Sequence, residues 1–407
     1  MVTQKQILSK LNRKERGHLL VQNNEIERTK DGFKVPSQTT KNKEYTVKTG
    51  KKWSCTCHDH QKENEKCKHI WAVELILTQQ AQKQDEQELR KQAEESYNQN
   101  WTAYNQSQTK ERKHFLQLLS DLTQTVENQE QSNGRPRKDL GSMIFHSALK
   151  VYTGFSLRRY ESLQKRAKQE DLVEDTCAYN TISHYLQKPE ITEKLEELIY
   201  KSASPLTTVE TEFAVDSSGF STSTFGKYFS HKHGEEREVR EWIKAHLISG
   251  VKTNIVTGVE LTKGNKHDSP QFKPLVEKTA EQFNIEEVSA DKAYNSRENY
   301  QLVEDLDGEA YIPFRKNTTG KSKGCKAWKK MYHKFQYNKE EFRDHYHKRS
   351  NSETVFHMIK EKFGEDIQSR KHRSQLNETL LKILCHNIVV TIHQIHEKGI
   401  QPECNVN

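Results

Sequence analysis

The chain has 407 residues, of which 32% are hydrophobic and 30% charged, and its formal net charge is +8. This length exceeds one ordinary domain and is enough for two or three. A positive balance favours polyanionic partners such as nucleic acid, and no apolar run approaches the roughly 18 residues of a membrane-spanning helix, so no membrane partner is expected.

The N-terminal residues MVTQKQILSKLNRKERG carry charges but lack the apolar stretch of a secretory signal peptide. The seven cysteines are an odd number, which argues against a framework of disulfides. Together these features predict a cytoplasmic protein whose cysteines serve another purpose.

A group of possible metal ligands lies in the segment WSCTCHDHQKENEKCKHIW, residues 53–71. Its spacing is Cys-x-Cys-x9-Cys-x-His, formed by Cys55, Cys57, Cys67 and His69. Three thiolates and one imidazole complete the tetrahedral shell of a structural zinc ion and leave no open position for chemistry. We therefore predict one structural Zn2+ per chain, and we interpret residues 58–60 as loop.

The flanking residues predict a small ββα unit around this zinc. Strand-like segments at 44–47 and 52–57 surround Gly50, and apolar residues recur at helical spacing from 69 to 78. The pattern resembles the SWIM zinc finger, in which Cys-x-Cys and Cys-x-His are separated by a variable gap. We assign residues 1–78 to a SWIM-like zinc finger domain, which would recognise DNA or another protein.

Residues 79–132 are rich in Gln, Glu and Lys and predict a polar helical linker. A coiled coil is the alternative, although its a and d positions would be unusually polar. Apolar spacing returns between residues 101 and 127.

Residues 133–205 predict an all-helical DNA-binding region. Its first residues, NGRPRKD, place Arg135 and Arg137 on either side of a proline, and such an arm can lie in a minor groove. An exposed linker is the alternative. The following helix, the turn at Gly154 and the basic helix capped by Ser156 suit a helix-turn-helix, although an ordinary helical subdomain would have the same pattern.

Residues 206–398 predict an α/β domain, because three strand patterns are followed by alternating helices and strands. The expected fold is a mixed sheet with helices on its faces. Within it, FAVD is a strand that stops at Asp216, and EEVSAD is a strand that ends at Asp291. Ser269 and Pro270 have the composition of a helix start.

Asp216 and Asp291 are both expected at the ends of strands, where ligand sites of α/β sheets collect. Two neighbouring carboxylates repel each other unless hard cations lie between them. Two Mg2+ ions, or Mn2+, about 4 Å apart are what two-metal phosphoryl transfer needs. Asp268 is the rival candidate for the second aspartate.

Glu353 is the candidate for a third carboxylate. On one helix of residues 346–360, it would share a face with Tyr346, Arg349 and Lys360. Cations suit phosphate, and the glutamate suits metal. The alternative is that Ser350 starts the helix in a capping box with Glu353, which would leave Tyr346 and Arg349 outside it.

A family resemblance favours the metal-ligand interpretation. Asp216, Asp291 and Glu353 resemble the acidic triad of DDE transposases from prokaryotic insertion sequences. The spacing Tyr-x2-Arg-x3-Glu-x6-Lys at residues 346–360 matches the signature of one clade. The segments GNKHDS, ADKAY and GRPRKDLGSMIFHSALKVYTGFSLRRY are also similar to that family.

The resemblance implies an RNase H-like catalytic core that cleaves DNA at terminal inverted repeats and transfers the strand to a target. Asp216, Asp291 and Glu353 would hold two Mg2+ ions, and Tyr346, Arg349 and Lys360 would hold the phosphates of double-stranded transposon-end DNA. The expected enzyme is a Mg2+-dependent DDE transposase that performs phosphodiester hydrolysis and transesterification. A homodimer would pair the two ends, in the nucleoid of a prokaryotic cell.

The segment 315–345 is basic with interleaved aromatic residues and corresponds to an insertion that contacts DNA in relatives. Trp328 would stack on a displaced base there, or would simply pack in the core. Two further functions stay open. A domesticated transposase would be a non-catalytic DNA-binding regulator, and an RNase H-like nuclease would cleave without strand transfer.

Overall fold

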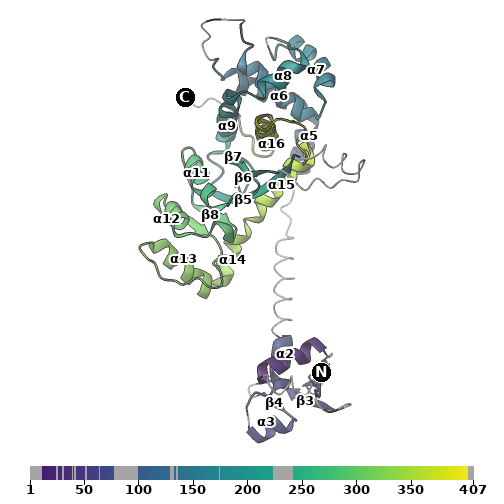
Figure 1. Cartoon of the computed structure of the whole chain (residues 1–407), viewed down its shortest axis with the longest axis vertical. Helices are drawn as coiled ribbons and strands as arrows, with labels where there is room; N and C mark the ends of the chain where they lie inside the picture. The colour runs from purple at the N-terminus through teal and green to yellow at the C-terminus, as the bar shows by residue number, and fades with distance from the viewer. Residues whose placement is uncertain are drawn as a thin grey trace. The chain divides into compact units, whose positions relative to one another are not determined.

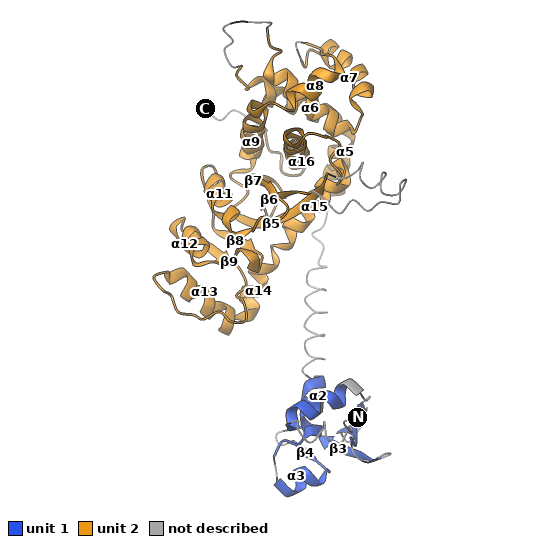
Figure 2. Cartoon of the chain, in the orientation of Figure 1, with its two compact units in different colours: residues 1–99 blue, residues 100–407 orange. Residues whose placement is uncertain are grey.

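The computed structural model describes residues 12–23, 26–29, 32–38, 40, 43–50, 53–63, 65–77, 100–128, 133, 136–173, 175–222 and 242–401. The chain divides into two compact units, residues 1–99 and residues 100–407 (Figure 2). Most of the predicted linker, residues 79–132, lies outside the described residues until residue 100.

The first unit is a small sheet with helices. Its elements are α2 (Arg13–Asn23), β1 (Glu27–Thr29), β2 (Gly32–Pro36), β3 (Glu44–Lys48), β4 (Ser54–Cys55) and α3 (His58–Glu63), and residues 68–77 are also helical. The four strands pair antiparallel in chain order. The predicted ββα unit is therefore present with two further strands, and residues 58–60 are helical rather than a loop.

The hydrophobic core of the first unit is small. It contains Leu20, Phe33, Val35, Val47, Ile70, Ala72, Val73 and the three cysteines of the predicted zinc site. Gly32 has a φ of +138°, and a Cβ atom there would lie 2.3 Å from the backbone oxygen of Val47. Only glycine therefore lets β2 approach β3 so closely.

The second unit begins with helices. These are α5 (Trp101–Gln124), α6 (Leu140–Thr153), α7 (Leu157–Gln169), α8 (Tyr179–Tyr185), α9 (Pro189–Ala203) and the short 3-10 helix η1 (Ser204–Leu206). The predicted helix after residue 139 and the Ser156 cap of the basic helix are both present. Helix α5 buries Phe115, Leu118, Leu119 and Leu122 against this unit, so that part of the predicted linker belongs to the folded core.

A mixed sheet follows these helices (Figure 1). Its strands are β5 (Glu212–Ser221), β6 (Trp242–Gly250), β7 (Val256–Lys263), β8 (Glu287–Ala290) and β9 (Glu309–Tyr311). The strand order is β7-β6-β5-β8-β9. The β5–β6 and β6–β7 pairs are antiparallel, whereas β5–β8 and β8–β9 are parallel.

The remaining elements lie between and after these strands. They are α11 (Ser269–Ala280), the 3-10 helix η2 (Lys292–Tyr294), α12 (Arg297–Asp305), α13 (Lys326–Tyr337), α14 (Lys339–His347), α15 (Ser350–Phe363) and α16 (His372–Lys398). Asp268, rather than Ser269, occupies the cap position of α11.

Helices cover both faces of the sheet. One apolar core joins Phe220 and Leu247 of the sheet to α5, α6, α9, α15 and α16. The other joins Phe213, Val215 and Ile248 to α11, α12, α13 and α14. In β5 and β6, residues of opposite parity face opposite cores, as the twofold period of a strand requires. The predicted mixed sheet with flanking helices is confirmed.

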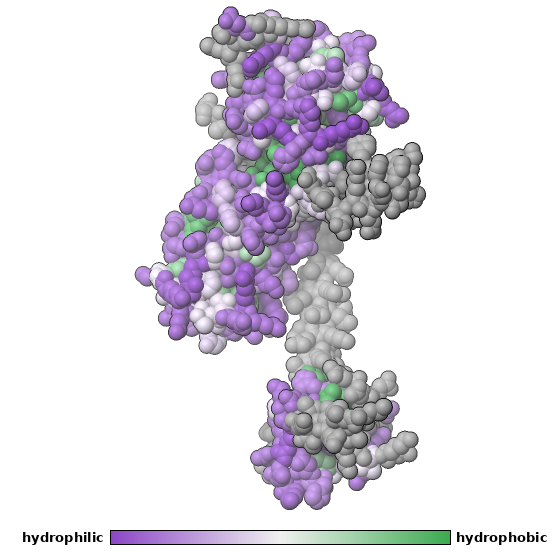
Figure 3. Space-filling view, viewed as in Figure 1, coloured by the Kyte–Doolittle hydropathy of each residue, from purple (hydrophilic) through white to green (hydrophobic). Residues whose placement is uncertain are grey.

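The surface of the second unit is largely polar. On the face drawn in Figure 3, hydrophilic residues predominate and hydrophobic residues form only small patches. Among the described residues, none of the helices combines the length and apolar composition that crossing a bilayer requires.

A buried histidine makes the stability of the second unit depend on pH. His386 of α16 is 2% exposed, and its Nε2–H donates to the backbone oxygen of Asn254 at 2.9 Å. Burial lowers the pKa of His386 from 6.5 to about 4. As the pH falls below the unfolded pKa, the unfolded chain therefore takes up this proton before the folded chain does.

We expect the free energy of unfolding to fall between about pH 6.5 and 4 by about 1.4 kcal/mol per pH unit for this one group. Urea unfolding of the full chain across that range measures the slope. His386→Gln should remove this part of the slope, whereas His372→Gln, an exposed position on the same helix, should leave it unchanged. Equal slopes for all three proteins would contradict the burial of a neutral imidazole.

Candidate functional site

The predicted zinc ligands converge in the first unit. Cys55 ends β4, Cys57 precedes α3, and Cys67 and His69 lie at the start of the helical residues 68–77. Their ligand atoms all lie within 4.8 Å of one another, and all four residues are buried. Among the described residues this is the one group of three or more His, Cys, Asp or Glu side chains that comes so close.

The donor set fits zinc. His69 Nδ1 lies 3.7 Å from Cys55 Sγ and 3.9 Å from Cys67 Sγ, and the buried Nε2 atom has no hydrogen-bond partner among the residues that the structure describes. Hydrogen bonding from the Cys55 thiol lowers the pKa of Cys67 to about 3, so a thiolate forms there readily. Three sulfurs and one nitrogen that are already gathered and shielded from water are typical of a closed structural site.

Neighbouring groups hold the ligands in place and engage their possible competitors. The ring of Tyr45 lies 4.6 Å from that of His69. Arg13 of α2 forms ion pairs with Asp59, Glu63 and Glu65. Asp59 is therefore occupied by Arg13 and does not join the metal ligands.

The two predicted aspartates lie side by side in the second unit. The parallel register pairs Val215 of β5 with Ala290 of β8, and Asp216 and Asp291 are the next residues on their strands. Each carboxylate accepts a hydrogen bond from the backbone N–H that follows it, at 2.9 Å for Asp216 and 2.7 Å for Asp291. The two side chains thus start from equivalent positions on neighbouring strands.

The predicted end of the first strand was wrong. Asp216 lies within β5 rather than at its end, because antiparallel pairing with β6 continues to Ser221 opposite Trp242. What ends at residue 215 is the pairing with β8. At Asp216 the strand is therefore still paired with β6 but no longer with β8.

Glu353 reaches the same region through Arg349. The guanidinium of Arg349 donates to Asp216 Oδ2 at 3.1 Å and to Glu353 Oε1 at 2.5 Å. The Asp216 side chain is 18% exposed and that of Glu353 is 60% exposed. An arginine therefore bridges two of the three predicted acids.

The predicted single helix of residues 346–360 is divided. α14 ends at His347 and α15 begins at Ser350, so Tyr346 and Glu353 belong to different helices. The capping box is not formed, since α15 has no side-chain cap and Ser350 Oγ donates to the His347 carbonyl. Packing of α14 and α15 on the sheet still brings Tyr346, Arg349 and Glu353 to one place.

The pKa of Asp216 depends on both of the other predicted acids. Burial raises the pKa of Asp216, and the carboxylates of Glu353 and Asp291 raise it further, while the Ser217 N–H and Arg349 oppose the shift. The pKa of Tyr346 is also raised by burial, and Asp291 and Asp216 act in the same direction. Tyr346, the arginine and the acids therefore share one electrostatic environment.

Lys360 and Ser218 extend this environment along β5. Lys360 Nζ donates to Ser218 Oγ at 3.0 Å, and Ser218 lies two residues after Asp216 on the same face of the strand. Sequence reasoning missed Ser218. Its position two residues beyond the acid is the signal that could have found it.

Asp268, the rival candidate, is engaged elsewhere. It forms an ion pair with Lys244, and His246 Nδ1 lies 3.7 Å from its Oδ1. Burial raises the pKa of Tyr294, and the carboxylates of Asp268, Asp216 and Asp291 add to the shift, so both this pair and the other acids act on its hydroxyl. Sequence reasoning quoted ADKAY but gave Tyr294 no role.

The structure describes two of the three other predicted DNA contacts. Trp328 is 4% exposed, and its indole N–H donates to the Thr319 carbonyl at 3.1 Å, so it packs in the core and cannot stack on a base. Arg137 Nη1 lies 3.6 Å from Glu190 Oε2 of α9. Arg135 lies outside the described residues.

Models of known protein families match residues in both units. The family model of a transposase DDE domain matches residues 207–388, and that of a SWIM zinc finger matches residues 45–77. The first range contains Asp216, Asp291 and Glu353, and the second contains all four zinc ligands.

A cryo-EM structure of a piggyBac transposase synaptic complex with hairpin DNA is also similar. It is 9% identical, the alignment covers 72% of this chain and 74% of that one, and the TM-score is 0.33. On the family matches, the chain carries a DDE transposase domain at residues 207–388 and a SWIM zinc finger at residues 45–77.

Proposed function

We propose that this chain is a DNA transposase that binds transposon terminal inverted repeats and catalyses strand cleavage and strand transfer with two divalent metal ions. One observation carries the proposal. Asp216 and Asp291 follow paired residues of neighbouring parallel strands, and Arg349 connects Asp216 to Glu353. Three acids and a phosphate-binding cation in one place suit phosphoryl transfer.

An RNase H-like core is part of this proposal. The order β7-β6-β5-β8-β9, with three antiparallel strands and then two parallel ones, supports it. Asp216 on the central strand, Asp291 after its parallel neighbour and Glu353 on a helix against the sheet would then form the catalytic triad. The proposed domains are 1–78, 79–132, 133–205 and 206–398, with the short basic insertion at 315–345.

The three acids offer hard oxygen ligands of the kind that Mg2+ or Mn2+ prefers. When bound, two such ions would activate the attacking oxygen and stabilise the leaving one. Asp216 and Asp291 would hold them from the sheet, and Glu353 from α15. Glu353 has the most exposed side chain of the three, so its side chain can change conformation when DNA binds.

Tyr346, Arg349 and Lys360 would bind the phosphates of the transposon end. Arg349 holds two carboxylates in this structure, so DNA would offer its guanidinium a phosphate in exchange. Among the described residues, Lys360 donates a hydrogen bond only to the Ser218 hydroxyl, and its ion pair with Glu365 is long, at 3.8 Å. Its charge is therefore available for an incoming phosphate.

Other parts of the chain would bind duplex DNA away from the reacting atoms. The helical region 133–205 would do so through α7, whose sequence LRRYESLQKRAKQ is basic, and the segment with Arg135 and Arg137 would lie along a groove. A homodimer would hold two ends together in the nucleoid of a prokaryotic cell. The finger, with one zinc ion, would bind DNA or protein during assembly.

The test uses a labelled duplex that carries the terminal inverted repeat found in the DNA flanking the gene. With Mg2+, we expect wild-type protein to cleave at the repeat end and to join that end to a target duplex. Joined strands on a denaturing gel are the measurement.

Each of the other possible outcomes would indicate a different function for this chain. Binding to the repeat without cleavage in Mg2+ or Mn2+ would make the chain a non-catalytic regulator. Cleavage without any joined strand would make it a nuclease. An unrelated duplex of equal length controls for nonspecific nicking.

A further inference from the structure

A basic groove lies in the second unit outside the acidic site. Its volume is about 500 Å³, and it is lined by the end of α6, the start of α7, α8 and the loop between α15 and α16. Its polar lining includes Lys150, Ser156, Ser183, Arg370, Lys371 and Ser374. Neither aspartate nor glutamate occurs among the described residues that line it.

The volume of this basic groove, 500 Å³, is enough to admit a phosphodiester segment of a nucleic-acid backbone.

Lys150 gives the groove a charge that no carboxylate balances. It is 9% exposed, and its Nζ donates to the side-chain oxygen of Gln368 at 3.1 Å. Among the described residues, no carboxylate oxygen lies within the 4.0 Å of an ion pair with it. Its neighbour Lys382 is also buried and donates to the carbonyls of Gly364 and Asp366. A mostly buried ammonium group without a counter-ion is costly, and a bound anion would remove that cost.

Two helix N-termini add to this charge. Ser156 caps α7, and α16 begins directly after Lys371 without a side-chain cap. The free N–H groups and the dipole of a helix start favour anions. Lys371 Nζ donates only to the amide oxygen of Gln187 at 2.7 Å, so its charge also lacks a carboxylate partner among the described residues. Cations, hydroxyls and helix starts thus face one cavity.

The groove is fixed relative to the three acids. Its loop follows α15, which carries Glu353 and Lys360, and leads into α16. Within that loop the Ile367 N–H donates to the Ser221 carbonyl at 2.8 Å, and Asp366 pairs with Ser221. Ser221 ends β5, the strand that holds Asp216. A nucleic-acid backbone bound in the groove would therefore be held in a constant position relative to the acidic site.

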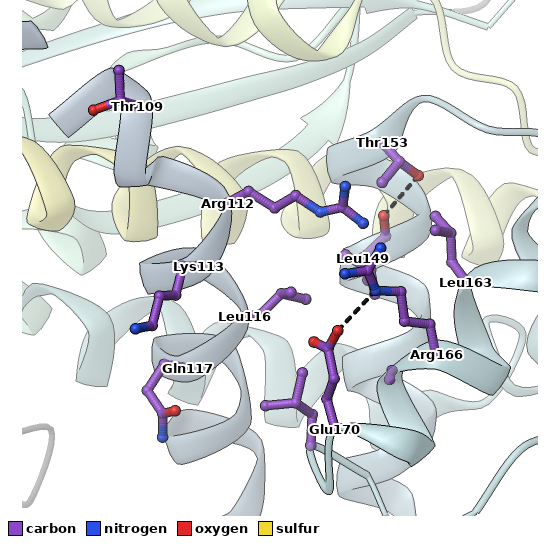
Figure 4. Close-up of a pocket in the computed structure, with 12 residues that line it drawn as sticks. Thr109, Arg112, Lys113, Leu116, Gln117, Leu149, Thr153, Leu163, Arg166 and Glu170 are labelled. Carbon is purple, nitrogen blue, oxygen red and sulfur yellow. Dashed lines mark hydrogen bonds and ion pairs between the residues drawn. The ribbon is translucent and has the colours of Figure 1, made fainter. Parts of the chain in front are cut away.

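A second cavity of 560 Å³ lies between α5, α6 and α7 and differs in chemistry. Figure 4 shows Arg166 paired with Glu170 there, beside Leu116, Leu149 and Leu163. One of its cations is thus already neutralised, and leucines form much of its wall. This cavity contains a carboxylate, that of Glu170, whereas no carboxylate of the described residues lines the basic groove.

We propose that the basic groove binds backbone phosphates of the duplex on which the acidic site acts. This inference rests on the proposed function, since the same DNA would span both sites. A sequence-independent phosphate contact of this kind would set the position and direction of the duplex. Lys150 and Lys371 would supply the charge, and the hydroxyls and helix N-termini would supply further donors.

The test compares wild-type protein with Lys150→Gln/Lys371→Gln in binding to the terminal-repeat duplex and to an unrelated duplex, across a range of salt. Each phosphate contact contributes about 0.9 to the slope of log K against log salt. We expect the double variant to lose about two units of slope and roughly tenfold in affinity at moderate salt, equally for both duplexes.

Lys371→Gln alone changes an exposed residue, so it tests the groove even if the double variant fails to fold. It should lose about one unit of slope. Lys273→Gln, an exposed lysine of α11 with an acidic partner, should keep the wild-type slope. Unchanged slopes in both groove variants would overturn the proposal.

Binding of inorganic phosphate that disappears in the groove variants, with unchanged DNA affinity, would also overturn it, because the groove would then hold a free anion. The proposed function is judged separately by wild-type cleavage and joining. If wild-type protein cleaves and joins while the groove variants bind as it does, only the groove assignment fails. If the groove variants lose slope but wild-type protein never cleaves, only the catalytic assignment fails.

Discussion

Asp216→Asn and Glu353→Gln should each lower Mg2+-dependent cleavage of the terminal-repeat duplex by about 10³-fold, equivalent to about 4 kcal/mol of transition-state stabilisation. Both changes keep the shape of the side chain and remove its charge. Asp216 is held by the sheet and Glu353 by α15, so neither change should disturb the fold. Single-turnover cleavage measured with saturating protein separates the chemical step from DNA binding.

Matched controls lie on neighbouring surfaces. Asp344→Asn on α14 and Glu361→Gln on α15 remove the same charges from exposed positions and should cleave as the wild type does. Binding of the duplex by Asp216→Asn should be retained, because Arg349 loses a carboxylate partner and is freer to meet a phosphate. Wild-type cleavage by either acid variant would show that the catalytic assignment is wrong.

Loss of zinc should unfold the first unit and spare the second. Structural zinc contributes about 10–16 kcal/mol of folding free energy in small finger domains. The first unit has few other buried apolar residues, and three cysteines are part of its core. Cys55→Ser, or a strong chelator, should therefore abolish the dispersed amide signals of residues 12–77 in NMR spectra. The measured zinc content should fall below one ion per chain.

Cys177→Ser is the matched control, since Cys177 lies in the second unit and is not a predicted ligand. It should keep its zinc. Cys55→Ser should weaken assembly on uncut ends more than cleavage of pre-bound ends. A first unit that stays folded without metal would contradict the structural role of the site.

The zinc finger shows how much a local pattern can predict. The spacing of Cys55, Cys57, Cys67 and His69 was enough to identify the ligands, because a tetrahedral shell permits few spacings. The two further strands and α3 were missed. All three elements are short, and β1 and α3 are also mostly exposed. Their structure depends on the pairing of β1 with β2 and of β2 with β3, and on the bridge from Arg13 to α3.

The acidic site shows which features a local sequence pattern cannot predict. The strands before Asp216 and Asp291 were visible as apolar runs, but the register that places these residues side by side depends on strand pairing over a long sequence separation. For Trp328, which lies in a basic segment, the sequence leaves both stacking on a base and packing in the core open. Its burial results from packing against Tyr300 and Phe314, which no local pattern reveals.

The arginine bridge has a thermodynamic consequence. If Asp216 and Glu353 hold a metal ion, that ion must compete with Arg349, which is tethered at high effective concentration. The affinity of the resting chain for metal is then lower than that of three unbridged acids. A phosphate that takes Arg349 raises the metal affinity, and by linkage the metal raises the affinity for DNA by the same factor. Such coupling would keep the chain from loading metal where no DNA is present.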